Sequence, residues 1–137
     1  MANLLLLSHS QLAESIYETV KLIMGNPSDS VSYITLPYGQ DLQAYQAEIE
    51  AHVEKAKDEG ILILTDLFGG SPFMISVKTF DKYHNTVPIE IISGMNLPMV
   101  VELVNAISQS RSLNELKEIA LNAGINGIVD FKAKLNA

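Results

Sequence analysis

The chain has 137 residues, carries nine Lys and Arg against sixteen Asp and Glu for a net charge of −7, and contains no cysteine. The length suits one domain with its own core, and the acidic balance argues against nucleic-acid binding. The lack of cysteine excludes a disulfide scaffold, a cysteine nucleophile, a thiolate zinc site and an iron–sulfur cluster. We therefore expect a single domain over residues 1–137, with no metal and no cofactor.

The chain begins with an apolar run. Residues 4–7 are four consecutive leucines, and the run ends at Ser8 and His9. A short continuous run of this kind is typical of a strand buried on both faces. It lacks the basic start of a signal peptide, and no segment approaches the ~20 apolar residues of a membrane span. We expect a cytoplasmic protein.

Helix and strand patterns alternate along the next 50 residues. A helix that stops at residues 25–27 is predicted by apolar residues at helical spacing, namely Leu12, Ile16, Val20 and Ile23. Residues 31–36 are less uniformly apolar and predict a strand near a sheet edge. Asp41 can cap a second helix, which runs out near residues 58–60. Its inward positions are Leu42, Tyr45, Ile49 and Val53.

The second half continues the alternation. Residues 61–65 predict a fully buried strand, and residues 66–70 a turn. Ser71 as cap and Pro72 at the first helical position open a helix. Its predicted buried face consists of Phe73, Val77 and Phe80. Residues 88–92 predict a fourth strand.

Two more helices and a tail complete the chain. The helix over residues 97–107 is apolar nearly all round, which indicates burial in a core or in a subunit interface. Ser112 and Glu115 form a capping box for a last helix that carries Leu113, Leu116 and Ile119. The tail, residues 127–135, contains Ile128, Val129 and Phe131 and is expected to add a final strand.

This order predicts an α/β fold: a doubly wound, mostly parallel, flavodoxin-like sheet with helices on both faces. Sites in such folds form at the carboxyl ends of the strands. Three loops follow strands there, at residues 8–10, 66–71 and 93–96. They converge if their strands are neighbours.

His9 is the only histidine in these loops; His52 and His84 lie in polar stretches and read as surface residues. A plain structural role is one interpretation of His9. Ser8 with Gln11 reads as a capping box, which places His9 at the first position of a helix. The positive end of a helix favours the neutral, nucleophilic imidazole and an anion bound to it.

Asp66 has three possible roles. As a histidine partner it accepts the Nδ1–H bond and leaves Nε2 free to attack. As a phosphoacceptor it would resemble the aspartate of a response-regulator receiver, but a receiver needs further acidic residues where this chain has Ser8, His9 and Ser10. Otherwise Asp66 merely caps a turn.

The turn after Asp66 suits a phosphate. Gly69 and Gly70 allow close backbone approach without Cβ interference, and Ser71 adds a hydroxyl at a helix start. The spacing matches neither GxxxxGK[ST] nor GxGxxG, so the nucleotide-binding motifs are absent.

At residues 4–9, 61–73 and 94–99 the sequence resembles the IIA domain of the mannose family of the bacterial sugar phosphotransferase system. The most specific stretch is Asp66 to Phe73, Asp-Leu-Phe-Gly-Gly-Ser-Pro-Phe. The resemblance implies a phosphocarrier and a homodimer with an exchanged terminal strand. Its histidine, His9, would accept a phosphoryl group from the histidine-containing phosphocarrier protein and pass it to the IIB component. IIB then phosphorylates sugar entering through the IIC and IID membrane components.

By the same resemblance Asp66 orients His9. We assign Ser8, Ser10, Gly69, Gly70 and Ser71 to phosphate binding. The residues near His9, most of them apolar, would form a shallow docking rim for both partners. The residues assigned to it are Phe68, Met95, Asn96 and Leu97.

The sequence departs from the family pattern at two positions. Many members have Gly where this chain has Ser10, and Trp where it has Phe68.

Residues 8–10 also resemble the phosphotransferase subunit of dihydroxyacetone kinase, and a non-catalytic flavodoxin-like regulatory domain is a third alternative. We expect no fused IIB domain. The sequence does not identify the transported sugar, because the membrane components select it. The candidates include mannose, fructose, sorbose, gluconate and N-acetylgalactosamine.

Overall fold

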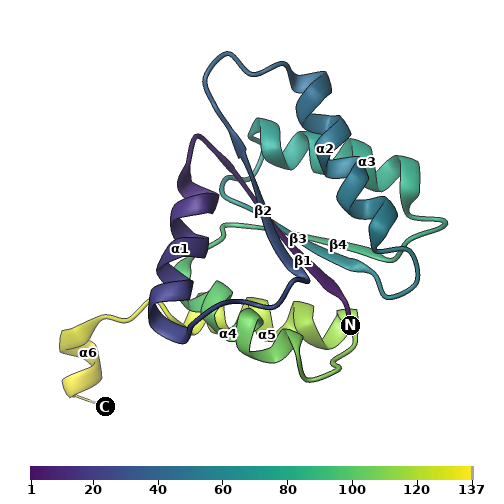
Figure 1. Ribbon diagram of the computed structural model, residues 1–137. Coiled ribbons are helices and arrows are strands. Elements are labelled where there is room, and N and C mark those ends of the chain that lie inside the picture. The colour runs from purple at the N-terminus through teal and green to yellow at the C-terminus, as the bar shows by residue number, and fades with distance from the viewer. Residues whose placement is uncertain (137) are drawn as a thin grey trace.

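Four parallel strands form the centre of the molecule in the computed structural model, which describes residues 1–136 (Figure 1). The strands are β1 (Asn3–His9), β2 (Val31–Leu36), β3 (Ile61–Thr65) and β4 (Ile89–Ser93), in the order β2-β1-β3-β4. In this register Leu7 pairs with Ile34 of β2 and with Thr65 of β3. The predicted parallel sheet is confirmed, with β2 at one edge.

Helices cover both faces of the sheet (Figure 1). One face carries α1 (Leu12–Met24), α4 (Leu97–Ile107) and α5 (Leu113–Asn126), and the other carries α2 (Leu42–Lys55) and α3 (Ser71–Tyr83). Side chains alternate between the faces along a strand. Leu4 and Leu6 therefore pack in the first layer, whereas Leu5 and Leu7 pack in the second. The doubly wound fold is confirmed.

The apolar side chains of helix α4 are buried in the core of a single chain. Its side chains Met99, Val100, Leu103 and Ile107 are buried in the first layer, and α4 packs against α1 and α5. Of the two environments that its sequence allowed, the structure shows the core. The apolar character of α4 is therefore no evidence for a subunit interface.

The predicted inward faces of three helices need correction. In α2, Leu42 is exposed, whereas Tyr45, Ile49 and Val53 are buried as predicted. In α1, Leu12 and Ile23 are exposed. In α3, Val77 and Phe80 are exposed and Phe73 is half-buried, and the buried residues are Pro72, Ile75, Ser76 and Thr79. Ser76 and Thr79 can face the sheet because their hydroxyls donate to carbonyls one turn earlier in the same helix.

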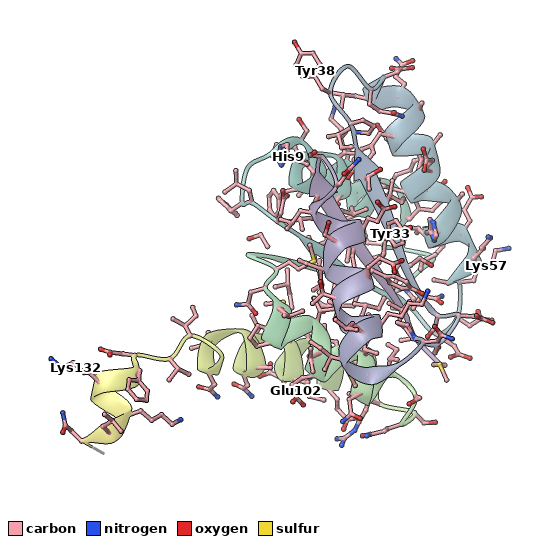
Figure 2. The ribbon with its side chains drawn as sticks, turned by 60° about the vertical axis from the view of Figure 1, so that its left-hand side comes forward. His9, Tyr33, Tyr38, Lys57, Glu102 and Lys132 are labelled. Carbon is pink, nitrogen blue, oxygen red and sulfur yellow. The ribbon has the colours of Figure 1, made fainter. Side chains whose placement is uncertain are left out.

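The expected final strand is wrong. Residues 131–135 form a short helix, α6 (Phe131–Leu135), whose start is capped by Asp130 accepting from the Ala133 N–H. Figures 1 and 2 show α6 standing off the body of the molecule beyond α5. Residue 137, which belongs to the predicted domain, lies outside the described residues. None of the helices in residues 1–136 is long and apolar enough to cross a membrane.

Candidate active site

His9 is the last residue of β1 and not the first residue of a helix. Strand β1 extends to His9 because His9 pairs with Leu36 of β2, and α1 begins only at Leu12. The intervening Ser10 has a φ of 51°, the left-handed region that favours glycine. This explains physically why glycine suits the position after the histidine.

Ser8 caps α1 by a different bond from the one predicted. Its buried hydroxyl accepts from the Ala13 N–H at 2.7 Å, and Gln11 makes no side-chain cap. The predicted capping box is therefore wrong, and the Ser8 hydroxyl is committed inside the fold rather than turned to a phosphate. Ser10, in contrast, is exposed beside His9.

Asp66 holds His9 by two bonds to one oxygen. Its Oδ2 accepts from the backbone N–H of His9 at 3.0 Å and lies 2.9 Å from the ring Nδ1. A carboxylate acceptor at Nδ1 places the ring proton there, so Nε2 carries the lone pair. The Asp66 side chain is 11% exposed and that of His9 45%. The pair thus has a buried acceptor and an accessible ring.

Gly70 lies directly against the imidazole. A Cβ built on Gly70 would be 2.6 Å from His9 Cε1 and 3.2 Å from Nε2, so only glycine fits here. Gly70 is also the N-cap of the 13-residue helix α3, which corrects the prediction that Ser71 caps it; Ser71 is its first helical residue. The start of α3, with its unpaired N–H groups and positive dipole end, therefore adjoins Nε2. Gly69 has a φ of 83° and completes the turn.

Exposed apolar side chains lie on the loops next to His9, and we define them as the rim: Tyr38, Leu42, Leu67 and Phe68. Tyr38 and Leu42 share a hollow with His9, and Leu67 and Phe68 lie in the turn between Asp66 and Gly70, which both contact the His9 ring. Phe68 is 74% exposed, and its ring packs against that of Phe73 at 4.8 Å between centroids. Tyr38 and Leu42 line a shallow hollow that also contains His9 and Ser10. Figure 2 shows Tyr38 and His9 at the same end of the molecule.

Sequence reasoning missed the Tyr38 side of this rim. The signal was available, because the loop after residue 36 follows a parallel strand and so lies at the same sheet edge as His9.

The loop after β4 contributes to the fold rather than to the rim. Met95 is buried in the core. Asn96 caps α4 by accepting from Met99 N–H at 3.1 Å, and its amide donates to the Gly124 carbonyl at 3.0 Å. Leu97 is half-buried in a groove between α1, α4 and α5. Of the four residues predicted to bind partners, Phe68 alone lies on the rim.

The other two histidines lie away from this site. His52 is half-buried on α2, and burial lowers the pKa of its ring. His84 is exposed and stacks on Phe80 at 4.9 Å between centroids. No group of three or more His, Asp or Glu side chains in residues 1–136 is arranged to hold a metal ion.

Similarity to known proteins places the chain in the class of phosphotransferase system IIA components. Residues 3–121 match the family EIIA-man, described as "PTS system fructose IIA component". The chain belongs to this mannose family of IIA components.

Curated relatives agree with this assignment. The "PTS system mannose-specific EIIAB component" of Escherichia coli strain K12 is 31% identical over 93% of this chain, but the chain spans only 38% of that protein. The "PTS system sorbose-specific EIIA component" of Lacticaseibacillus casei is 29% identical over 85% of this chain and 83% of the relative.

Solved structures share the fold closely. Phosphotransferase system component EIIA from Streptococcus agalactiae has a TM-score of 0.86 at 28% identity, covering 97% of this chain and 99% of that one. The IIA protein associated with the fucose utilization operon of Streptococcus pneumoniae has a TM-score of 0.80 at 27% identity, covering 98% and 99%.

Proposed function

We propose that this protein is a phosphocarrier for sugar uptake, which accepts a phosphoryl group on Nε2 of His9 and passes it on. The donor is the phosphohistidine of the histidine-containing phosphocarrier protein, and the acceptor is a IIB component that serves IIC and IID membrane components. The observation that carries the proposal is the single Asp66 oxygen 2.9 Å from Nδ1, because it leaves Nε2 as the nucleophile of an accessible ring.

The transfer needs positioning more than covalent chemistry. The Nε2 lone pair forms a bond to phosphorus while the donor's P–N bond breaks. The electron pair of the breaking bond returns to the donor imidazole. Gly70 lets the main chain approach the transferring group, and the start of α3 stabilises its negative charge. The Ser10 and Ser71 hydroxyls are the side-chain donors that we assign to the phosphoryl oxygens.

The rim suits short-lived complexes with two different partners. It is apolar, exposed and centred on the reactive ring. Small interfaces support rapid exchange better than large ones. We assign the docking of both the phosphocarrier protein and IIB to this rim, with Phe68 and Tyr38 as its aromatic anchors.

A homodimer is part of the proposal, and the tail supports it. Ile128, Val129, Phe131 and Leu135 are all exposed in the single chain. Such a run of large apolar side chains beyond the body is stabilised when a second copy covers it.

The test is phosphorylation in a defined mixture. The protein is incubated with labelled phosphoenolpyruvate, enzyme I and the phosphocarrier protein, and then with a mannose-type IIB. We expect an acid-labile label on the protein that moves to IIB. His9→Ala abolishes labelling, whereas the matched variant His84→Ala retains it. Absence of label on the wild-type protein, or label that survives His9→Ala, contradicts the proposal.

A further inference from the structure

Three buried side-chain atoms in the described residues have no hydrogen-bond partner: the hydroxyl oxygens of Tyr45 and Thr65, and Oδ1 of Asp66. A buried polar atom that lacks every hydrogen-bond partner is costly in free energy. One of the three belongs to the carboxylate that holds His9. The three atoms therefore call for one explanation that includes this carboxylate.

The three residues lie toward the same end of the sheet. Thr65 is the last residue of β3 and shares its face with Ile61 and Ile63, two residues apart along the strand. Ile61 and Ile63 belong to the same buried cluster as Tyr45 of α2, which is fully buried. The helix returns from the carboxyl end of β2, so Tyr45 in its first turn lies at the sheet edge that carries His9 and Asp66.

Asp66 also acts electrostatically on Tyr45. Burial raises the pKa of the Tyr45 phenol most, and the negative charge of Asp66 raises it further. The phenol therefore keeps its proton at every working pH, and its O–H is a permanent donor.

We propose that Tyr45 is a positioning residue for phosphoryl transfer, which supports Oδ1 of Asp66 through one ordered water molecule that Thr65 also binds. A buried water makes about three hydrogen bonds to otherwise unpaired polar groups. Here the Tyr45 hydroxyl donates to the water, and the water donates to Asp66 Oδ1 and to Thr65 Oγ1.

This arrangement fixes the carboxylate at both ends. Oδ2 is occupied by two N–H groups of His9, and Oδ1 by the water, so the carboxylate cannot rotate when the ring gains or loses a phosphoryl group. The inference rests on the proposed function for its kinetic consequence, but not for its effect on the tautomer of His9.

Tyr45→Phe removes the hydroxyl and keeps the ring that fills the core. We expect transfer from the phosphocarrier protein to slow ~10-fold, equivalent to ~1.4 kcal/mol, and the Nδ1–H tautomer of unphosphorylated His9 to decrease in nitrogen NMR spectra. Thr65→Val should act in the same direction and serves if Tyr45→Phe does not fold. Tyr83→Phe, whose hydroxyl bonds Glu50 and Glu54 on the far part of α2, is the matched control and should change neither readout.

The decisive comparison repeats Tyr45→Phe in the Asp66→Ala background. If Tyr45 acts through Asp66, the second substitution has no further effect. An equal loss in both backgrounds, or a wild-type rate and tautomer in Tyr45→Phe, overturns the inference. A wild-type protein that takes no phosphoryl group defeats the proposed function instead, and the tautomer measurement still decides the role of Tyr45.

Discussion

Two surfaces of this molecule expose large apolar side chains, and they are built differently. Apart from Leu42 at the start of α2, the rim around His9 lies on loops that hydrogen bonds hold, with Gly70 N–H donating to the Leu67 carbonyl and Gln40 N–H to the Pro37 carbonyl. The tail carries Phe131 and Leu135 on a short helix that stands off the body (Figure 2). Apolar exposure alone therefore does not say what a surface is for. Our proposal assigns partner docking around His9 to the rim, and contact with a second copy to the tail.

The largest expected effect is on the tail. Deleting residues 129–137 removes Val129, Phe131 and Leu135, each of which contributes ~1.5–3 kcal/mol when fully buried. The truncated protein should sediment as a monomer or aggregate, and any monomer should still be phosphorylated on His9. Analytical ultracentrifugation measures the first outcome and labelling the second. A full-length protein that sediments as a stable monomer contradicts the role given to the tail.

The next effect concerns the centre of the rim. Asp66→Ala leaves the nucleophile in place but frees the ring and its tautomer, so transfer should slow ~100-fold without being abolished. Rapid-quench measurement of the label on His9 gives the rate. Asp81→Ala, an exposed carboxylate on α3, is the matched control and should leave the rate unchanged. A loss below about threefold would remove Asp66 from the chemistry.

A smaller effect separates the two surfaces directly. Phe68→Ala should lower kcat/KM for transfer ~10-fold, because a central aromatic anchor contributes more than ~1 kcal/mol to docking, and should leave the dimer intact. Phe131→Ala should weaken the dimer and leave transfer unchanged. Both rings are exposed to a similar degree, 74% and 73%. If each substitution altered both properties, the division between rim and tail would be lost.

The smallest expected effect is on stability, and it comes from an ion pair outside both surfaces. Lys82 of α3 bonds Glu50 of α2 at 2.5 Å and, as the main cause, lowers the pKa of that carboxyl. The folded protein then binds this proton less tightly than the unfolded chain. The stabilisation is therefore present above the unfolded pKa of ~4.3 and is lost as the pH falls through the lower folded pKa. Glu50→Gln should cost ~0.5 kcal/mol near neutral pH and nothing in acid. Urea unfolding at both pH values checks this, and an equal cost at both contradicts it.

The sequence predicts the sheet well because its strands carry strong local signals. It also predicts that His9 and Asp66 reach the same edge, and partnership with His9 was one of the roles it allowed for Asp66. Continuous apolar runs mark β1 and β3, and a polar residue at the end of each strand must reach the same edge. The precise end of β1 escaped prediction because it depends on pairing with Leu36, 27 residues further along the chain. The cap formed by Ser8 over five residues is likewise set by tertiary structure.

Other features depend on which side chains can be buried at little cost. Ser76 and Thr79 replace the expected Val77 and Phe80 on the inner face of α3, because their hydroxyls bond within their own helix. Tyr45 was correctly predicted as a core residue. The proximity of Tyr45 to Asp66 could not be predicted, because it arises from how α2 packs in the folded chain.

The most direct test of the central claim is the position of the phosphoryl group on His9. The protein is phosphorylated with nitrogen-labelled histidine, and phosphorus and nitrogen NMR identify the bonded ring atom. Asp66 Oδ2 lies 2.9 Å from Nδ1 and accepts its proton in a hydrogen bond. We therefore predict the phosphoryl group on Nε2, with Nδ1 still protonated. A phosphoryl group on Nδ1 would contradict the roles assigned to both residues.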